Sequence, residues 1–407
     1  MERFGLLGER LGHSLSPQIH SYFGEYPYTL IEKEKDELAA FFVAPEFRAI
    51  NVTIPYKKDV MAFCDELDET AQRIGSVNTI RFDSDAVRGY NTDYFGFRYL
   101  LEKNGVPVTG RKVLVLGSGG SSVTACCVLR DMQAREVVVI SRSGENNYDN
   151  LERHADAGVI VNTTPVGMYP HNLVAPLDLT RFPECEAVVD IVYNPLKTQL
   201  LLDAEQLGMI AVNGLEMLVA QGKRAAEIFF ERAFDDELIE STVCSMAQRF
   251  CNVVLVGMPG CGKSTVGRLL SQRLDKEFTD TDVVVEKTAG RTIPDIIVAD
   301  GEMAFRDLEE AAVEETGKRL GQVIATGGGA ILRERNRLAL RQNGVVIFLE
   351  RSIEKLATVG RPLSNGRAAL QALYEQRLPL YRGMADHIVA VDDDPQVTCE
   401  RILEVLK

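Results

Sequence analysis

Residues Gly257–Thr265 read Gly-Met-Pro-Gly-Cys-Gly-Lys-Ser-Thr, which fits the pattern G-x4-G-K-[ST]. The β-branched apolar run Asn252–Val256 precedes them, and a helical stretch through Leu274 follows. This order predicts a phosphate-binding loop, because glycines let backbone N–H groups curl around phosphate oxygens and a helix N-terminus adds the positive end of its dipole. We expect Lys263 to reach the β- and γ-phosphates of ATP and the Ser264 hydroxyl to bind Mg²⁺. The residues expected around the nucleotide are Gly257, Met258, Pro259, Gly260, Cys261, Gly262, Lys263, Ser264 and Thr265.

The order of strand, glycine turn and helix occurs at two earlier places as well. Phe4–Leu7 runs into Gly8, and Lys112–Leu116 leads into a glycine turn followed by a helical stretch, Val123–Met132. Further runs typical of buried strands are Val137–Ile140, Val159–Val161, Val188–Val192, Val323–Ala325 and Val345–Leu349. Strands that alternate with helices predict an α/β protein with parallel sheets throughout.

Length and composition limit the class of protein further. The 407 residues predict two or three domains. A formal charge of −14 argues against a nucleic-acid partner, so anionic small molecules would need local Lys and Arg clusters. There is no signal-peptide pattern and no run of eighteen apolar residues, which predicts no membrane partner. The eight cysteines are scattered, and we expect reduced thiols and a cytoplasmic location.

The second glycine turn has the features of a dinucleotide-binding site. Gly117, Gly119 and Ser122 form a G-x-G-x-x-S turn, which by itself is a weak signal. The following strand, Val137–Ile140, ends in a segment that contains Arg142. A reader of the cofactor ribose is expected at the end of this second strand, where an Arg favours the 2′-phosphate of NADP and an acid would favour NAD. Ser143-Gly144-Glu145-Asn146 follows without a second Arg, so NAD stays open as an alternative.

Three polar clusters lie upstream in apolar surroundings. They are Ser14-Leu15-Ser16-Pro17, Asn51-Val52-Thr53-Ile54-Pro55-Tyr56-Lys57, and Gly75-Ser76-Val77-Asn78-Thr79 followed by Asn91-Thr92-Asp93. Neutral hydroxyl and amide groups of this kind suit a polyol. Lys57 and Asp93 offer an acid–base pair that could pass a proton to or from a carbinol oxygen during hydride transfer.

The C-terminal part resembles shikimate kinase over essentially all of 252–407. The resemblance rests on the phosphate loop, Asp280-Thr281-Asp282, Phe305-Arg306 with Glu309, Gly327-Gly328-Gly329, Arg361-Pro362-Leu363 and Arg377-Leu378-Pro379-Leu380-Tyr381. It implies that shikimate is held by Asp282, Arg306, Gly328, Gly329 and Arg377. It also implies that Asp282 accepts the proton of the attacking hydroxyl, that Asp280 supports Mg²⁺, and that Arg361 stabilises the transferring phosphoryl group from a lid.

The N-terminal part, about 1–245, resembles shikimate dehydrogenase. Besides the clusters above, the resemblance rests on Asn162-Thr163-Thr164-Pro165-Val166-Gly167-Met168, Asp190-Ile191-Val192-Tyr193 and 213–221. It implies that the shikimate skeleton is bound by Ser14, Ser16, Thr53, Lys57, Asn78, Asp93, Tyr193 and Gln221, with Lys57 as the acid–base group and Asp93 as its partner. It implies that the cofactor is bordered by Gly117, Ser118, Gly119, Gly120, Ser121, Ser141, Arg142, Ser143, Thr163, Ile191 and Gly214.

Together, the two resemblances predict one chain with two consecutive activities: NADPH-dependent reduction of 3-dehydroshikimate and ATP-dependent phosphorylation of shikimate. The expected fold is an α/β substrate domain (1–104 plus 213–248), a Rossmann NADP-binding domain (105–212) and a P-loop kinase domain (249–407) whose parallel sheet is flanked by helices. Two alternatives stay open, which are a quinate dehydrogenase using NAD and an inactive regulatory scaffold that binds nucleotides. The sequence does not indicate an oligomeric state.

Overall fold

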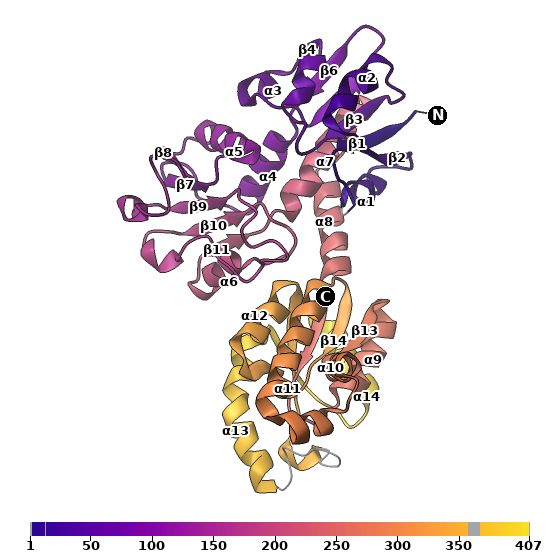
Figure 1. Cartoon of the computed structure of the whole chain (residues 1–407), viewed down its shortest axis with the longest axis vertical. Helices are drawn as coiled ribbons and strands as arrows, with labels where there is room; N and C mark the ends of the chain where they lie inside the picture. Colours follow the sequence, from indigo (N-terminus) through magenta and orange to yellow (C-terminus); the bar gives the residue numbers. More distant parts are fainter. Residues whose placement is uncertain (1, 13, 357–366, 407) are drawn as a thin grey trace. The chain divides into compact units, whose positions relative to one another are not determined.

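The computed structural model of the chain describes residues 2–12, 14–356 and 367–406. The chain divides into two compact units, which Figure 1 colours in sequence order. The first unit comprises Met1–Val166, Ala175–Tyr193 and Asp203–Ser245, and the second comprises Gly167–Val174, Asn194–Leu202 and Met246–Lys407. Within the described ranges, no helix combines the length and the apolar character needed to span a bilayer.

The first sheet of the first unit has the strand order β2-β1-β3-β5-β6-β4. Its strands are β1 (Phe4–Gly8), β2 (Tyr28–Glu32), β3 (Ala49–Val52), β4 (Glu66–Leu67), β5 (Thr79–Phe82) and β6 (Val87–Tyr90). β1 pairs in parallel with β2 and β3, but β5 runs antiparallel to both β3 and β6. The prediction of parallel sheets throughout is therefore wrong here. A short turn joins β5 to β6, closed by the N–H of Asp83 on the carbonyl of Ala86 at 3.0 Å, and so short a connection permits only antiparallel pairing.

The second sheet of this unit is wholly parallel, with the order β11-β10-β9-β7-β8. Its strands are β7 (Lys112–Leu116), β8 (Glu136–Ile140), β9 (Val159–Asn162), β10 (Ala187–Asp190) and β11 (Ile210–Val212), which confirms the predicted strands in this region. In chain order the sheet reads 2-1-3-4-5, a doubly wound arrangement. Such sheets bind ligands outside the carboxyl ends of the strands where the order reverses, which here lies between β7 and β9.

Helices cover these sheets and connect them. They are α1 (Ser16–Ser21), α2 (Leu38–Val43), α3 (Glu69–Ile74), α4 (Asp93–Lys103), α5 (Gly120–Asp131), α6 (Gln199–Gln206), α7 (Leu215–Phe230) and α8 (Glu237–Phe250). α4 and α7 pack against each other. The segment after Leu215 forms two helices, because Glu231 adopts a left-handed conformation (φ 51°) that ends α7. Short 3₁₀ turns occur at Lys35–Glu37, Asp59–Phe63, Leu151–His154, Leu179–Arg181, Ala330–Leu332 and Ile353–Lys355.

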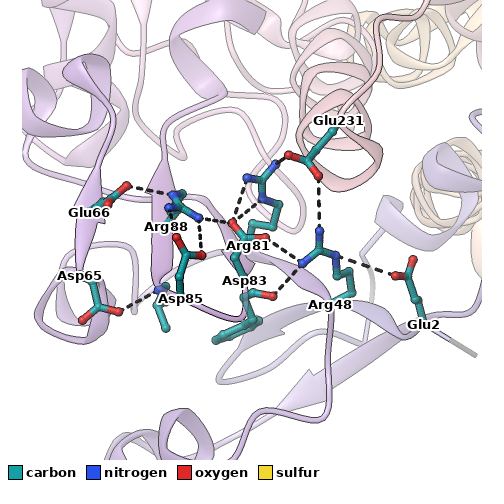
Figure 2. Close-up of polar contacts among 11 residues, drawn as sticks. Glu2, Arg48, Asp65, Glu66, Arg81, Asp83, Asp85, Arg88 and Glu231 are labelled. Carbon is teal, nitrogen blue, oxygen red and sulfur yellow. Dashed lines mark hydrogen bonds and ion pairs between the residues drawn. The ribbon is translucent and has the colours of Figure 1, made fainter.

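An ion-pair network connects the β5–β6 hairpin to the C-terminus of α7 (Figure 2). Asp83, at the hairpin turn, accepts hydrogen bonds from Arg48 at 2.7 Å, Arg81 at 2.9 Å and Arg88 at 2.6 Å. Arg81 also lies 2.7 Å from Glu231, the left-handed residue that ends α7. Burial acts to raise the pKa of Asp83, but the arginine partners outweigh it and hold that pKa below its usual value. The network therefore couples the hairpin to the helix by partly buried charges.

The second unit contains one parallel sheet in the order β13-β14-β12-β15-β16. Its strands are β12 (Asn252–Val256), β13 (Glu277–Asp280), β14 (Gln322–Ala325), β15 (Gly344–Glu350) and β16 (His387–Ala390). Its helices are α9 (Lys263–Leu274), α10 (Thr281–Ala289), α11 (Ile293–Lys318), α12 (Glu334–Gln342), α13 (Arg367–Met384) and α14 (Pro395–Val405). β12 is fully buried and reads Asn-Val-Val-Leu-Val, as expected of a central strand covered on both faces.

Two segments from the middle of the chain belong to this second unit, 167–174 and 194–202. They are held by Gln342, the last residue of α12, and by Asn343, which follows it. The side chain of Gln342 donates to the carbonyl of Asn172 at 2.8 Å, and its backbone carbonyl accepts from the N–H of Lys197 at 2.8 Å. Asn343 donates to the Tyr169 hydroxyl at 2.6 Å. Both amide side chains are almost fully buried, so these hydrogen bonds satisfy groups that would otherwise be costly to bury.

Two candidate active sites

The phosphate loop lies between β12 and α9, and its backbone conformation depends on glycine. Gly257, Gly260 and Gly262 have φ values of 151°, 83° and 104°, which other residues rarely adopt. A side chain at Gly257 would also approach the Leu349 carbonyl to 2.8 Å. Lys263 begins α9 and is 8% exposed, and its ammonium donates to the carbonyls of Gly257 and Met258 at 2.8 and 3.0 Å. The lysine therefore lies directly over the predicted phosphate cradle.

The residues predicted to support Mg²⁺ come together next to this loop. The Ser264 hydroxyl donates to Asp280 Oδ2 at 2.6 Å, across from the first turn of α9 to the end of β13. A hydroxyl and a carboxylate are hard oxygen donors, and Mg²⁺ is commonly held by one or two such groups together with phosphates of the substrate. The donor set therefore fits the ion. Bound Mg²⁺ would supply charge neutralisation on the phosphates.

Asp282 lies in the first turn of α10, two residues after Asp280. Its Oδ1 atom is buried and lacks a hydrogen-bond partner among the described residues. Burial, and after it the nearby Asp280 carboxylate, raise the pKa of Asp282 to about 6, while the Lys263 ammonium acts in the opposite direction. A buried carboxylate that has a free acceptor atom and is largely ionised at neutral pH suits a general base.

Two buried arginines face the same site from α11 and α13. Arg306 is 7% exposed and donates to Glu309 at 2.7 Å and to Glu302 at 3.0 Å. Arg377 is 4% exposed and donates to the Gly328 carbonyl at 3.1 Å, and its Nε atom has no partner among the described residues. A side chain at Gly329 would come within 2.4 Å of the Arg306 guanidinium, which explains the glycine. Guanidinium groups so held suit a carboxylate ligand.

These side chains line one cavity of about 630 Å³. The residues predicted for the second unit that lie on its wall are Pro259, Gly260, Gly262, Lys263, Ser264, Thr265, Asp280, Asp282, Arg306, Gly328, Gly329 and Arg377. Gly257, Met258 and Cys261 of the predicted loop do not line it, and Arg361 lies outside the described residues. An apolar wall formed by Ile293, Ile297, Phe305 and Leu373 completes the cavity, and no motif in the sequence predicts a role for it. Glu309, named with Arg306 in the sequence motif but without a role of its own, is 1% exposed, and burial raises its pKa even though Arg306 opposes this effect. The spacing of three residues on one helix places Arg306 and Glu309 side by side.

In the first unit, Lys57 and Asp93 form the predicted pair. The Lys57 ammonium lies 2.6 Å from Asp93 Oδ2, and the two side chains are 25% and 16% exposed. Lys57 follows β3 and Asp93 begins α4, so the pair joins residues that are distant in sequence. Because both groups keep some access from outside, a substrate hydroxyl or carbonyl can approach them.

The other residues predicted to bind substrate come from several elements. Asn78 accepts the N–H of Thr92 at 2.7 Å, and Thr92 donates in turn to Gln221 at 3.4 Å, so Asn78 and Gln221 are linked through the residue that precedes Asp93. The hydroxyls of Ser14 and Ser16 are 3.2 Å apart at the start of α1. The N–H of Thr53 donates to Leu7 at 2.9 Å just beyond β3. Tyr193 follows β10, and burial raises its pKa.

The predicted cofactor site lies where the strand order of the second sheet reverses. Gly117 has a φ of 103° and follows β7, and a side chain there would approach Thr163 Oγ1 to 3.0 Å. A side chain at Gly119 or Gly120 would meet nothing within 4 Å, so the turn and the start of α5 are open on this face. Gly214 allows no side chain, since its Cβ would lie 2.0 Å from the Ile191 carbonyl. A helix N-terminus with an open glycine turn fits a pyrophosphate.

Arg142 lies at the end of β8, beside this turn, and its side chain is exposed. Burial raises the pKa of Tyr148, and the positive charge of Arg142 acts to lower it. The loop that contains Arg142 is closed by Ser141, whose N–H donates to the Asn146 carbonyl at 3.1 Å. An unburied guanidinium at this position fits the 2′-phosphate of NADP.

The two sites define a class of protein: an oxidoreductase with a doubly wound nucleotide-binding sheet, followed in the same chain by a P-loop kinase. Comparison with known proteins agrees on both parts. Residues 6–80 match the family model for the shikimate dehydrogenase substrate binding domain, and residues 259–407 match the one for shikimate kinase.

Individual relatives cover the N-terminal part. A shikimate dehydrogenase (NADP(+)) of Clostridium perfringens is 36% identical over 269 residues, which is 60% of this chain and 99% of the relative. A solved chorismate mutase/shikimate 5-dehydrogenase fusion protein from Clostridium acetobutylicum is 34% identical, with a TM-score of 0.58 over 60% of this chain and 97% of that one. Shikimate 5-dehydrogenase from Thermus thermophilus, solved with NADP(H) and shikimate, is 33% identical, with a TM-score of 0.55 over 60% and 99% of the two chains.

The chain therefore belongs to the shikimate dehydrogenase family over its N-terminal three fifths, and its remaining part is a shikimate kinase domain. The predicted α/β fold class is confirmed. The comparisons favour neither of the two alternatives, the quinate dehydrogenase or the inactive scaffold.

Proposed function

We propose that this chain reduces 3-dehydroshikimate to shikimate with NADPH and then phosphorylates the 3-hydroxyl of shikimate with ATP. The observation that carries the proposal is that each site offers groups suited to one part of the same compound, its hydroxyls in one site and its carboxylate in the other. One offers the Lys57–Asp93 pair and a set of hydroxyl and amide groups for a polyol. The other offers two buried arginines and a carboxylate base within one cavity of the phosphate loop.

In the first site, bound NADPH would supply the hydride. The Lys57 ammonium donates a proton to the oxygen of the carbonyl as that oxygen gains negative charge. Asp93, 2.6 Å away, holds this ammonium in place before the transfer. Asn78 and Gln221 orient the ring hydroxyls. The net change is one carbonyl reduced, with one hydride and one proton consumed.

In the second site, the chain's own residues position the acceptor and neutralise charge. Arg306 and Arg377 hold the carboxylate of shikimate, and Asp282 accepts the proton of the attacking hydroxyl. Lys263 leaves the loop carbonyls to contact the phosphates, and Ser264 with Asp280 would hold Mg²⁺. Since phosphoryl transfer asks little covalent work of the protein, this positioning and charge neutralisation account for the rate.

We also propose the predicted division into a substrate domain (1–104 plus 213–248), an NADP-binding domain (105–212) and a kinase domain (249–407). Its support is that each range contains its own sheet. The remaining predictions are part of the same proposal: a cytoplasmic location, and small molecules in place of nucleic acid or membranes as partners.

The test uses the purified full-length chain. NADPH formation from shikimate and NADP, and ADP formation from ATP with shikimate, are measured together with the mass of each product. Lys57→Ala should abolish only the first reaction and Lys263→Ala only the second. The matched controls are Lys58→Ala and Lys287→Ala, two exposed lysines near the respective sites. If the unmodified chain turns over shikimate in neither assay, the proposal is wrong.

A further inference from the structure

A buried chain of hydrogen bonds runs between residues proposed to bind substrate in the first unit. It includes Tyr28, the first residue of β2, which the proposed mechanism does not use. The Tyr28 hydroxyl donates to Asn51 Oδ1 at 2.8 Å. Ser16 hydrogen-bonds the same hydroxyl and acts to lower its pKa, although burial raises that pKa well above its ordinary value. One phenol therefore connects the Ser14–Ser16 cluster to the cluster that contains Asn51.

From Asn51 the chain continues through the buried side chains of Thr79, Asn78 and Thr92 to Gln221, which is partly buried. Asn51 donates to Thr79 at 3.1 Å, and Thr79 donates to Asn78 Oδ1 at 3.2 Å. Asn78 donates through Nδ2 to Thr92 Oγ1 at 3.0 Å. The hydroxyl of Thr92 has two acceptors within reach, Gln221 at 3.4 Å and Asn78 Oδ1 at 3.2 Å. Asn51, Asn78, Thr79 and Thr92 are each at most 5% exposed, so the series connects Tyr28 to Gln221 through groups that water does not reach.

The aromatic ring of Tyr28 is held on one face by a stack of rings. The His20 ring lies parallel to it, with centroids 4.1 Å apart and an interplanar angle of 17°. Phe229 of α7 stacks with His20 at 5.4 Å and 15°. Burial lowers the pKa of His20 to about 3, so the stacked ring is uncharged at neutral pH. The orientation of the Tyr28 hydroxyl is thus set by packing, independently of the substrate.

We propose that Tyr28 is a positioning residue for substrate recognition in the dehydrogenase site. Its hydroxyl fixes the amide of Asn51, and through Thr79 it fixes the orientation in which Asn78 presents its own amide. The inference rests on the proposed function, since Ser16, Asn78 and Gln221 are the residues assigned there to the shikimate skeleton. Preorganised partners of this kind increase affinity because the free enzyme has already ordered them.

The primary test is Tyr28→Phe in the full-length chain, which removes one hydroxyl and leaves the ring stack in place. We expect the KM for shikimate in the NADP-dependent reaction to rise about 5- to 10-fold, the loss typical of one buried hydrogen bond, while kcat stays within about twofold. The matched control is Tyr26→Phe. The Tyr26 hydroxyl bonds His20 Nδ1 at 2.6 Å, and His20 in turn hydrogen-bonds Asn51, so Tyr26 reaches the series only through the stacked ring and this variant should raise the KM less than Tyr28→Phe does.

Two further measurements separate positioning from other effects. The KM for shikimate in the kinase reaction of the same variant should not change, because Tyr28 lies in the first unit. In a double-mutant cycle with Asn78→Ala, the effects of the two changes on KM should be less than additive, since Tyr28 acts through Asn78. Additive effects, an unchanged KM in Tyr28→Phe, or equal rises in Tyr28→Phe and Tyr26→Phe would each overturn the inference. If the unmodified chain does not oxidise shikimate with NADP, the proposed function fails instead.

Discussion

The backbone N–H of Asp282 donates to the carboxylate of Asp280 at 3.1 Å, so one acid caps the helix on which the other lies. This places two carboxylates with different environments side by side. Asp280 bonds the Ser264 hydroxyl, whereas Asp282 is buried with one unpaired oxygen. Burial first, and the charge of Asp280 second, raise the pKa of Asp282 to about 6. This difference supports the proposed roles, metal support for Asp280 and proton transfer for Asp282.

The kinase reaction should therefore lose rate in mild acid. Asp282 must be ionised to accept a proton, and the fraction ionised falls as the pH drops through about 6. Below that value we expect kcat to fall about tenfold for each pH unit. Asp282→Asn should lower kcat about 10²-fold or more at neutral pH. The measurement is the pH–rate profile, with Asp307→Asn, an exposed acid on α11, as the control. A flat profile across pH 6 would contradict the role of Asp282.

Arg306→Lys should weaken shikimate binding in the kinase site. The change keeps the positive charge but removes the planar fork that pairs with a carboxylate and with Glu309. We expect the KM for shikimate to rise about tenfold or more, with the KM for ATP nearly unchanged. Steady-state kinetics with each substrate varied in turn provides the measurement. Arg335→Lys, whose side chain is 55% exposed, serves as the control. An equal rise in both KM values would show that Arg306 does not act on shikimate.

Arg142→Ala should reduce the preference for NADP. The exposed guanidinium at the end of β8 is the cation predicted to meet the 2′-phosphate, which NAD lacks. We expect kcat/KM for NADP to fall about 10- to 100-fold and that for NAD to change little. The comparison variant is Arg153→Ala, which removes another exposed arginine of the same sheet region. If both cofactors are affected equally, the specificity comes from elsewhere.

Asp83→Asn should destabilise the first unit, because it removes the negative charge shared by three arginines and replaces one of the two acceptor oxygens with an NH₂ donor (Figure 2). We expect the free energy of unfolding at neutral pH to fall by about 1–3 kcal/mol, a value reduced from that of fully buried pairs by the partial exposure of the arginines.

The sign of the pH dependence follows from the lowered pKa of Asp83. When folding lowers the pKa of a carboxylate, that group stabilises the protein at pH values above its pKa in the unfolded chain. The stabilisation is lost as the pH falls through its pKa in the folded protein. The difference between the unmodified chain and Asp83→Asn in denaturant unfolding should therefore shrink in acid. Asp85→Asn is the control, since Asp85 is 67% exposed and pairs with Arg88 alone in the network. A difference that grows in acid would contradict this account.

Local patterns in the sequence were sufficient for much of the fold and for the loops that surround the nucleotides. The strands β8, β9, β10, β12, β14 and β15 were predicted because β-branched apolar runs need cover on both faces, although β8, at the edge of its sheet, is only partly buried. The phosphate loop was predicted because positive φ at Gly260 and Gly262 requires glycine, a constraint that acts within a few residues. The assignment of shikimate followed from the joint order of motifs in each half.

Tertiary structure decided the features that depend on contacts between distant residues. The antiparallel pairing of β5 with β3, the contact of Arg81 with Glu231 and the inclusion of 167–174 in the second unit have no local sequence signal. The same holds for the series from Tyr28 to Gln221, whose members come from β2, β3, β5, α7 and the residues that precede β5 and α4. A hydrogen bond needs its donor and acceptor within about 3 Å, and only the packed fold brings residues so far apart in sequence to that distance.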